Sequence, residues 1–135
     1  MATRSYIGVR NTDGSVDYIY CHFDGYPDGV GKTLTKYYSK MNQVSELMEL
    51  GDLSVLGEQI GEQHDFDSPV KGWCRAYGRD RGEVNVGVKN SNFRELINDQ
   101  NVDYVYVFDG DYWECFDPYF PDTIINLYNM ASSEA

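Results

Sequence analysis

Polar and apolar residues alternate in two separate parts of the chain, and each part predicts a β-hairpin. Residues 5–10 and 16–23 are rich in β-branched and aromatic side chains, and the turn signal Asn-Thr-Asp-Gly lies between them at 11–14. A second pair of alternating runs lies within residues 102–116 and is joined by an Asp-Gly turn. The first of these two runs is the clearest strand pattern in the chain. Antiparallel pairing is expected in both hairpins.

Apolar residues that recur three or four positions apart predict short helices. These helices are expected over residues 34–41, 42–51, 92–99 and 121–128. Residues 72–78 have the composition of a further strand, 79–83 read as a charged loop, and 52–69 read as an irregular acidic segment. We therefore predict a single α+β domain over residues 1–135. Its antiparallel sheet is built from two hairpins plus a further strand, with two to four short helices packed on it.

Charge changes this picture more than any other feature of the composition. The chain has 22 acidic and 11 basic residues, which gives a formal net charge of −11. The acids are unevenly placed, because residues 41–70 and 95–135 contain no lysine or arginine. Such a field repels nucleic acids and anionic membranes over most of the surface and attracts basic partners. The alternative is that the acids serve only to keep the protein soluble.

Hydropathy and cysteine usage indicate the compartment. No run approaches the ~18 apolar residues that span a bilayer, and the N-terminal segment has no apolar signal region. Cys21, Cys74 and Cys115 lie far apart, which fits a reducing cytoplasm better than a disulfide framework. The chain has no Cys-x-x-Cys or His-x-x-x-His spacing, so we expect no metal site and no cofactor.

The stretch Gly-Tyr-Pro-Asp-Gly-Val-Gly-Lys-Thr-Leu at 25–34 is similar to a phosphate-binding loop but departs from it in spacing. Five residues separate Gly25 from Gly31, where that loop has four. Tyr26 is bulky, and Asp28 would repel a phosphate. We interpret this stretch as a strand-to-helix corner in which the glycines permit the bend.

The segment around the second hairpin carries the first candidate site. Acidic and aromatic residues are interleaved there, and acids that flank exposed aromatic rings suit a basic groove on another protein. The candidate partner-binding residues are Asp109, Asp111, Tyr112, Trp113, Glu114 and Asp117. The alternative is a core hairpin whose acids are simply solvated.

A second candidate site combines four residues from two parts of the chain. His22 and Asp24 would share one face of a strand, since alternate residues point the same way. Arg79 and Arg81 lie in the chain's one basic focus and could grip a phosphate. Two alternatives stay open: the arginines pair with acids of the protein itself, and His22 only shapes the corner.

Three motifs together resemble a family of small proteins encoded by tailed phages and prophages. They are Met-Ala-Thr-Arg-Ser at 1–5, Tyr-Cys-His-x-Asp-Gly-Tyr at 20–26 with a following Gly-Lys, and Tyr-Gly-Arg-Asp-Arg-Gly-Glu at 77–83. The family has no established activity. The resemblance therefore implies a setting, the cytoplasm of an infected bacterial host, and no mechanism.

The resulting hypothesis is a non-catalytic phage accessory protein. It would bind and inhibit a host defence or nucleic-acid-processing protein through an acidic surface that mimics DNA. The expected partner is a host protein with a basic surface. We expect no direct binding of nucleic acid or membrane, and a homodimer stays open. The alternative is a binder or enzyme for a small phosphate-containing or nucleotide ligand that uses His22, Asp24, Arg79 and Arg81.

Overall fold

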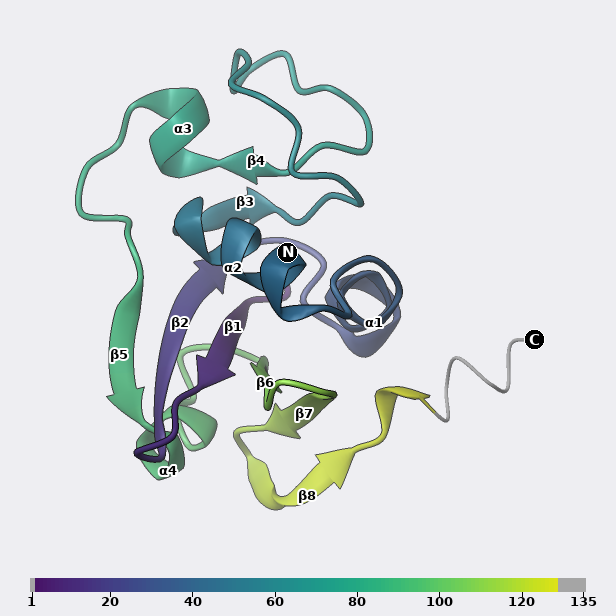
Figure 1. Ribbon diagram of the computed structural model, residues 1–135, viewed down its shortest axis with the longest axis vertical. Helices are drawn as coiled ribbons and strands as arrows, with labels where there is room; N and C mark the ends of the chain where they lie inside the picture. The colour runs from purple at the N-terminus through teal and green to yellow at the C-terminus, as the bar shows by residue number, and fades with distance from the viewer. Residues whose placement is uncertain (1, 129–135) are drawn as a thin grey trace.

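Eight strands form one mixed sheet in the computed structural model, which describes residues 2–128 (Figure 1). The strands are β1 (Ser5–Arg10), β2 (Ser15–Cys21), β3 (Leu53–Val55), β4 (Arg75–Ala76), β5 (Lys89–Asn92), β6 (Tyr104–Phe108), β7 (Trp113–Asp117) and β8 (Phe120–Ile125). Their order across the sheet is β4-β3-β2-β1-β6-β7-β8, and β5 pairs with β2.

Both predicted hairpins are present, and they share this sheet. β1 pairs with β2 and β6 pairs with β7, both antiparallel. The two hairpins meet where β1 runs parallel to β6, with Ser5 opposite Tyr104 and Val9 opposite Phe108. β2 and β3 also pair in parallel. The α+β class is therefore confirmed, while the sheet is mixed and not antiparallel throughout.

The helices are short and lie on both faces of the sheet. They are α1 (Lys32–Tyr37), α2 (Met41–Glu49), α3 (Tyr77–Arg81) and α4 (Phe93–Ile97), and a π-helical turn, η1 (Pro27–Gly31), leads into α1. In Figure 1, α2 lies in front of β1 and β2, α1 lies to the right of α2, and α4 lies behind the lower ends of β1 and β2. α2 ends as predicted, because Gly51 follows it with a φ of +74°.

Strand alternation divides the buried side chains into two clusters. The cluster under α1 and α2 takes Ile7 of β1 and Phe108 of β6, together with Leu34 and Leu47 of the helices. The opposite face carries a smaller cluster, in which Leu96 and Ile97 of α4 pack with Val105, Val107 and Phe116. The larger core therefore lies on the α1–α2 side of the sheet.

Several predicted elements differ from the structure. Residues 53–55 of the segment predicted as irregular form β3, and the strand predicted over 72–78 is limited to β4 at 75–76. Residues 120–125 form β8 and not a helix, because Ile124 pairs with Phe116 and Ile125 pairs with Cys115 on β7. A helical turn begins only at Leu127, and any continuation past residue 128 lies outside the described residues. The charged segment predicted as a loop forms α3, which ends at Gly82 with a φ of +73°.

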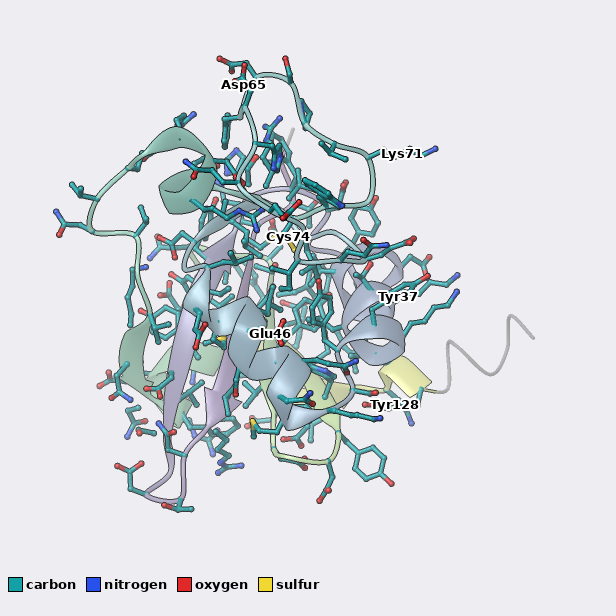
Figure 2. All side chains as sticks on the ribbon, turned by 45° about the horizontal axis from the view of Figure 1, so that its top comes forward. Tyr37, Glu46, Asp65, Lys71, Cys74 and Tyr128 are labelled. Carbon is teal, nitrogen blue, oxygen red and sulfur yellow. The ribbon has the colours of Figure 1, made fainter. Side chains whose placement is uncertain are left out.

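A long loop, residues 56–74, connects β3 to β4. Asp65 and Lys71 point outward from this loop in Figure 2. The loop folds back on itself, since the Gln59 N–H donates to the Gly72 carbonyl at 3.0 Å. Within residues 2–128, no helix has the length and apolar character needed to cross a bilayer.

Candidate functional site

The glycine-rich stretch is a tightly packed corner. Gly25 donates its N–H to Thr3 O at 2.9 Å, and its carbonyl accepts the Tyr106 hydroxyl at 2.6 Å. A Cβ on Gly25 would lie 2.7 Å from Thr3 O, so a larger residue cannot fit without a shift. The amide of Val30 donates to Asp24 O at 2.8 Å, which directs it into the corner. These bonds support the corner interpretation over a phosphate-binding loop.

Arg79 is held by the protein itself. Its Nε donates to Asp80 Oδ1 at 3.0 Å, Nη1 donates to Ile60 O at 2.8 Å, and Nη2 donates to Cys74 O at 2.8 Å. These bonds tie α3 to both ends of the 56–74 loop. A guanidinium engaged in this way lacks the free fork that would grip a phosphate.

Asp80 is the matching acid, and its side chain is 0% exposed. Its oxygens also accept the backbone N–H groups of His64 at 3.1 Å and of Ala76 at 2.8 Å. Burial alone would raise the pKa of Asp80, but the hydrogen bonds from Arg79, Ala76 and His64 outweigh it and hold that pKa below its ordinary value. The network therefore stabilises the packing of α3 against β4 and the 56–74 loop.

Arg81 contacts two aromatic rings that stack on each other. Its guanidinium carbon is 4.4 Å from the ring centre of Phe66 and 4.8 Å from that of Tyr77, and the group forms an ion pair with Glu83. Both arginines of the predicted ligand site thus pair internally, which is one of the alternatives that the sequence leaves open.

His22 and Asp24 do not join these arginines in the contacts of residues 2–128. His22 Nδ1 shares a 2.7 Å hydrogen bond with the Tyr20 hydroxyl. Asp24 takes a φ of +59° at the corner and accepts the Tyr26 hydroxyl at 3.3 Å. The regular alternation that would place His22 and Asp24 on one face ends with β2 at Cys21. The four residues therefore do not form the predicted ligand site.

The predicted acidic hairpin is present as β6 and β7, but Trp113, one of the six predicted binding residues, is buried. Trp113 is 2% exposed, and its Nε1 donates to Tyr38 O at 2.8 Å in the core. Trp113 is therefore corrected from a binding residue to a core residue, because β7 turns it toward α1 and α2. At the β6–β7 turn, Tyr112 is 63% exposed, and Asp109 Oδ1 accepts the N–H groups of Asp111 and Tyr112 at 2.8 Å.

The remaining predicted acids lie in two other places. Glu114 points to the opposite face of β7, where it lines a groove with Arg10 and Arg94. Asp117 ends β7, roughly 13 Å from its start at 3.3 Å per residue. The six predicted residues therefore do not form one surface.

Asp117 belongs instead to a cavity at the other end of the hairpin. The cavity has a volume of about 370 Å³. It is lined by Ala2, Thr3, Tyr26, Asp103, Tyr104, Asp117 and Tyr119. With Asp24 and Asp28 beside Tyr26, we call this region the acidic end.

The sheet topology brings the acidic end together. β2 is antiparallel to β1, β6 is parallel to β1, and β7 is antiparallel to β6. The end of β2, the start of β6 and the end of β7 therefore lie side by side at the end of the sheet where β1 begins. Asp103 also holds the N-terminal segment, because its Oδ2 accepts the backbone N–H of Arg4 at 3.0 Å.

Nearby carboxylates raise the pKa of two tyrosines at the acidic end. The pKa of Tyr104 is raised by burial and then by the nearby charges of Asp117 and Asp103. The pKa of Tyr26 is raised by the charge of Asp24, by its hydrogen bond to Asp24, and by Asp28. Four carboxylates therefore act on this small region.

Sequence reasoning missed most of this site. It selected Asp117 and Asp24 for other reasons, and it did not select Tyr26, Asp103 or Tyr104. A signal does exist, since Asp-Tyr stands at the start of the clearest strand and Asp-Gly-Tyr follows the second strand. Only the parallel pairing of β1 and β6 makes these segments neighbours.

Fold and site together define a small α+β domain with an acidic, aromatic cavity at the ends of its central strands. In residues 2–128 no group of three or more histidine, cysteine, aspartate and glutamate side chains is placed to hold a metal ion. No protein-family model, no curated protein and no solved structure matches the chain.

Proposed function

We propose that this protein is a phage accessory protein that binds a basic host protein through the acidic end and inhibits it. The observation that carries the proposal is the acidic end itself, where Asp103 and Asp117 line a cavity with three tyrosines. No lysine or arginine is among the residues that line this cavity. The resemblance to small phage proteins supports the setting.

The mechanism is competition for a groove that otherwise receives phosphates. Carboxylates of the acidic end occupy the basic groove, and exposed tyrosines add contact area. The net charge of −11 steers the approach over longer distances, which raises the association rate at low salt. A host defence enzyme or another nucleic-acid-processing protein has the required groove. The proposal assigns no catalytic residue.

Two variants of equal charge test this proposal. The first carries Asp24→Asn, Asp28→Asn, Asp103→Asn and Asp117→Asn at the acidic end. The control carries Glu46→Gln, Glu49→Gln, Glu58→Gln and Glu62→Gln on α2 and the 56–74 loop. Each change removes the same amount of charge, so a difference between them reports position.

The measurement is capture of proteins from host lysate at low and high salt, followed by competition with an oligonucleotide. We expect the wild type and the control to retain a nucleic-acid-binding protein at low salt and release it at high salt. The acidic-end variant should lose it. Equal capture by both variants, or capture that salt does not weaken, would count against the proposal.

A further inference from the structure

We propose that the cavity of the acidic end receives an arginine side chain of the partner. This inference rests on the proposed function and deepens it, because it names the chemical group that anchors the complex. The cavity is lined by the rings of Tyr26, Tyr104 and Tyr119 and by two carboxylates. Its volume of about 370 Å³ lies near the lower end of the range for small-ligand pockets, roughly 300–1,000 Å³.

The tyrosines supply aromatic ring surface whose faces can attract a cation. Tyr119 is 57% exposed and Tyr26 is 42% exposed, so both rings remain accessible to a partner. Tyr104 is partly buried. A guanidinium over an aromatic ring is attracted by the ring quadrupole, and it also stacks through its plane.

The carboxylates supply the counter-charge and keep acceptors for a ligand. Asp103 Oδ2 accepts the Arg4 N–H at 3.0 Å, and Asp117 Oδ1 accepts the Tyr119 N–H at 2.9 Å. Within residues 2–128, no hydrogen bond engages the second oxygen of either group. One oxygen of each carboxylate is therefore left for the N–H groups of a guanidinium.

The chain already contains one arginine that is bound by aromatic rings and a carboxylate of the protein itself. Arg81 lies 4.4 Å from the ring centre of Phe66 and 4.8 Å from that of Tyr77, and it pairs with Glu83. At the acidic end the rings and carboxylates are present, and no arginine lines the cavity. The partner's side chain would complete an equivalent arrangement.

Arginine fits this set better than lysine for a geometric reason. The planar guanidinium can stack on a ring while its edge donates to two carboxylates, whereas an ammonium is a point charge that is more strongly hydrated. Asp103 directly precedes β6, Asp117 ends β7, and both line the same cavity, so donors that fan out in one plane can reach both.

A titration with short peptides tests the inference directly. The probe is the capped peptide Gly-Gly-Arg-Gly-Gly, and its lysine and citrulline counterparts are the comparisons. Chemical shifts of the backbone amides are followed by NMR on the full chain. We expect saturable shifts at Asp103, Tyr104 and Tyr119 with the arginine peptide. The lysine peptide should bind several-fold more weakly, and the neutral citrulline peptide should give no saturation.

Variants then locate the site. Tyr119→Ala should weaken arginine-peptide binding about fivefold, and Asp117→Asn by a similar factor. Tyr112→Ala and Asp111→Asn, at the opposite end of the hairpin, should leave it unchanged. All four residues lie at exposed or partly exposed positions, and an unchanged amide spectrum away from the substitution confirms that each variant folds.

The outcomes separate the inference from the proposed function. Equal affinity for lysine and arginine, shifts away from the cavity, or equal effects of Tyr119→Ala and Tyr112→Ala would overturn the arginine site. If the peptides fail but capture of the host protein still depends on the acidic-end carboxylates, the inference falls and the proposed function stands.

Discussion

At the scale of single residues, the three cysteines are shielded by the core. Cys21 and Cys115 are completely buried, and burial raises the pKa of each thiol to about 12. The pKa of Cys74 is also raised, first by burial. Only a thiolate attacks a disulfide reagent efficiently, so neither access nor ionisation favours reaction in the folded protein.

We therefore expect none of the three thiols to react with Ellman's reagent at pH 8 in the native state. The same sample in guanidinium chloride should release colour for all of them at once. Rapid modification of any cysteine without denaturant would show that the sulfur is accessible.

Gly29 is a second residue whose environment makes a sharp prediction. A Cβ at Gly29 would lie 2.3 Å from Asp24 O, which is a backbone atom of the corner, whereas a Cβ at Gly87 would meet nothing within 4 Å. Gly29→Ala should lower the free energy of unfolding by about 1–3 kcal/mol, because the corner must shift. Gly87→Ala should change it by less than about 0.5 kcal/mol. Urea denaturation of the two variants makes the comparison, and equal stability would contradict the packing seen at η1.

At the scale of elements, the Arg79–Asp80 pair joins α3, β4 and the 56–74 loop. Asp80→Asn would leave the guanidinium of Arg79 without its counter-charge among buried carbonyls. The pair is part-buried, so breaking it in this way costs about 2–3 kcal/mol, less than for a fully buried pair. We expect a loss of that order in the free energy of unfolding at pH 7. Asp67→Asn, at an exposed position in the same loop, is the control and should have little effect.

The pH dependence of stability gives an independent check on this network. The pKa of Asp80 is lower in the folded protein than in the unfolded chain, so the unfolded chain binds the proton more readily. The stability from this group is therefore fully present above about pH 4, the ordinary carboxyl pKa, and is lost as the pH falls through the lowered value. The difference between wild type and Asp80→Asn should shrink between pH 7 and pH 3. A difference that stays constant would rule out a role for the Asp80 charge.

Element prediction succeeded where the signal was local. The two hairpins and α2 are set by alternation, by turn residues and by the glycine after the helix, all within a few positions of one another. β8 was missed because its strand state comes from pairing with β7, which overrides the helical spacing of its apolar residues. α3 was missed because Asp80 and Arg79 gain partners from residues far along the chain.

At the scale of the whole molecule, the same reasoning explains the candidate site. An acidic patch was predictable from charge, and Asp117 was among the residues chosen. Its neighbours were not predictable, because Tyr26 and Asp103 meet only through a parallel strand pair. Trp113 was misjudged because alternation assigns it to one face of β7 without saying which face is buried. Composition set the sign of the surface, and topology set its location.

Because β1 lies between β2 and β6, its strand pairing cannot be completed early in translation. The first hairpin leaves the ribosome early, but the partner for its inner edge follows only after Tyr104 has emerged. Until then β1 presents an unpaired edge to other nascent chains, and such edges invite aggregation. Synthesis of the protein should therefore depend on chaperone capacity in the cell more than its small size suggests.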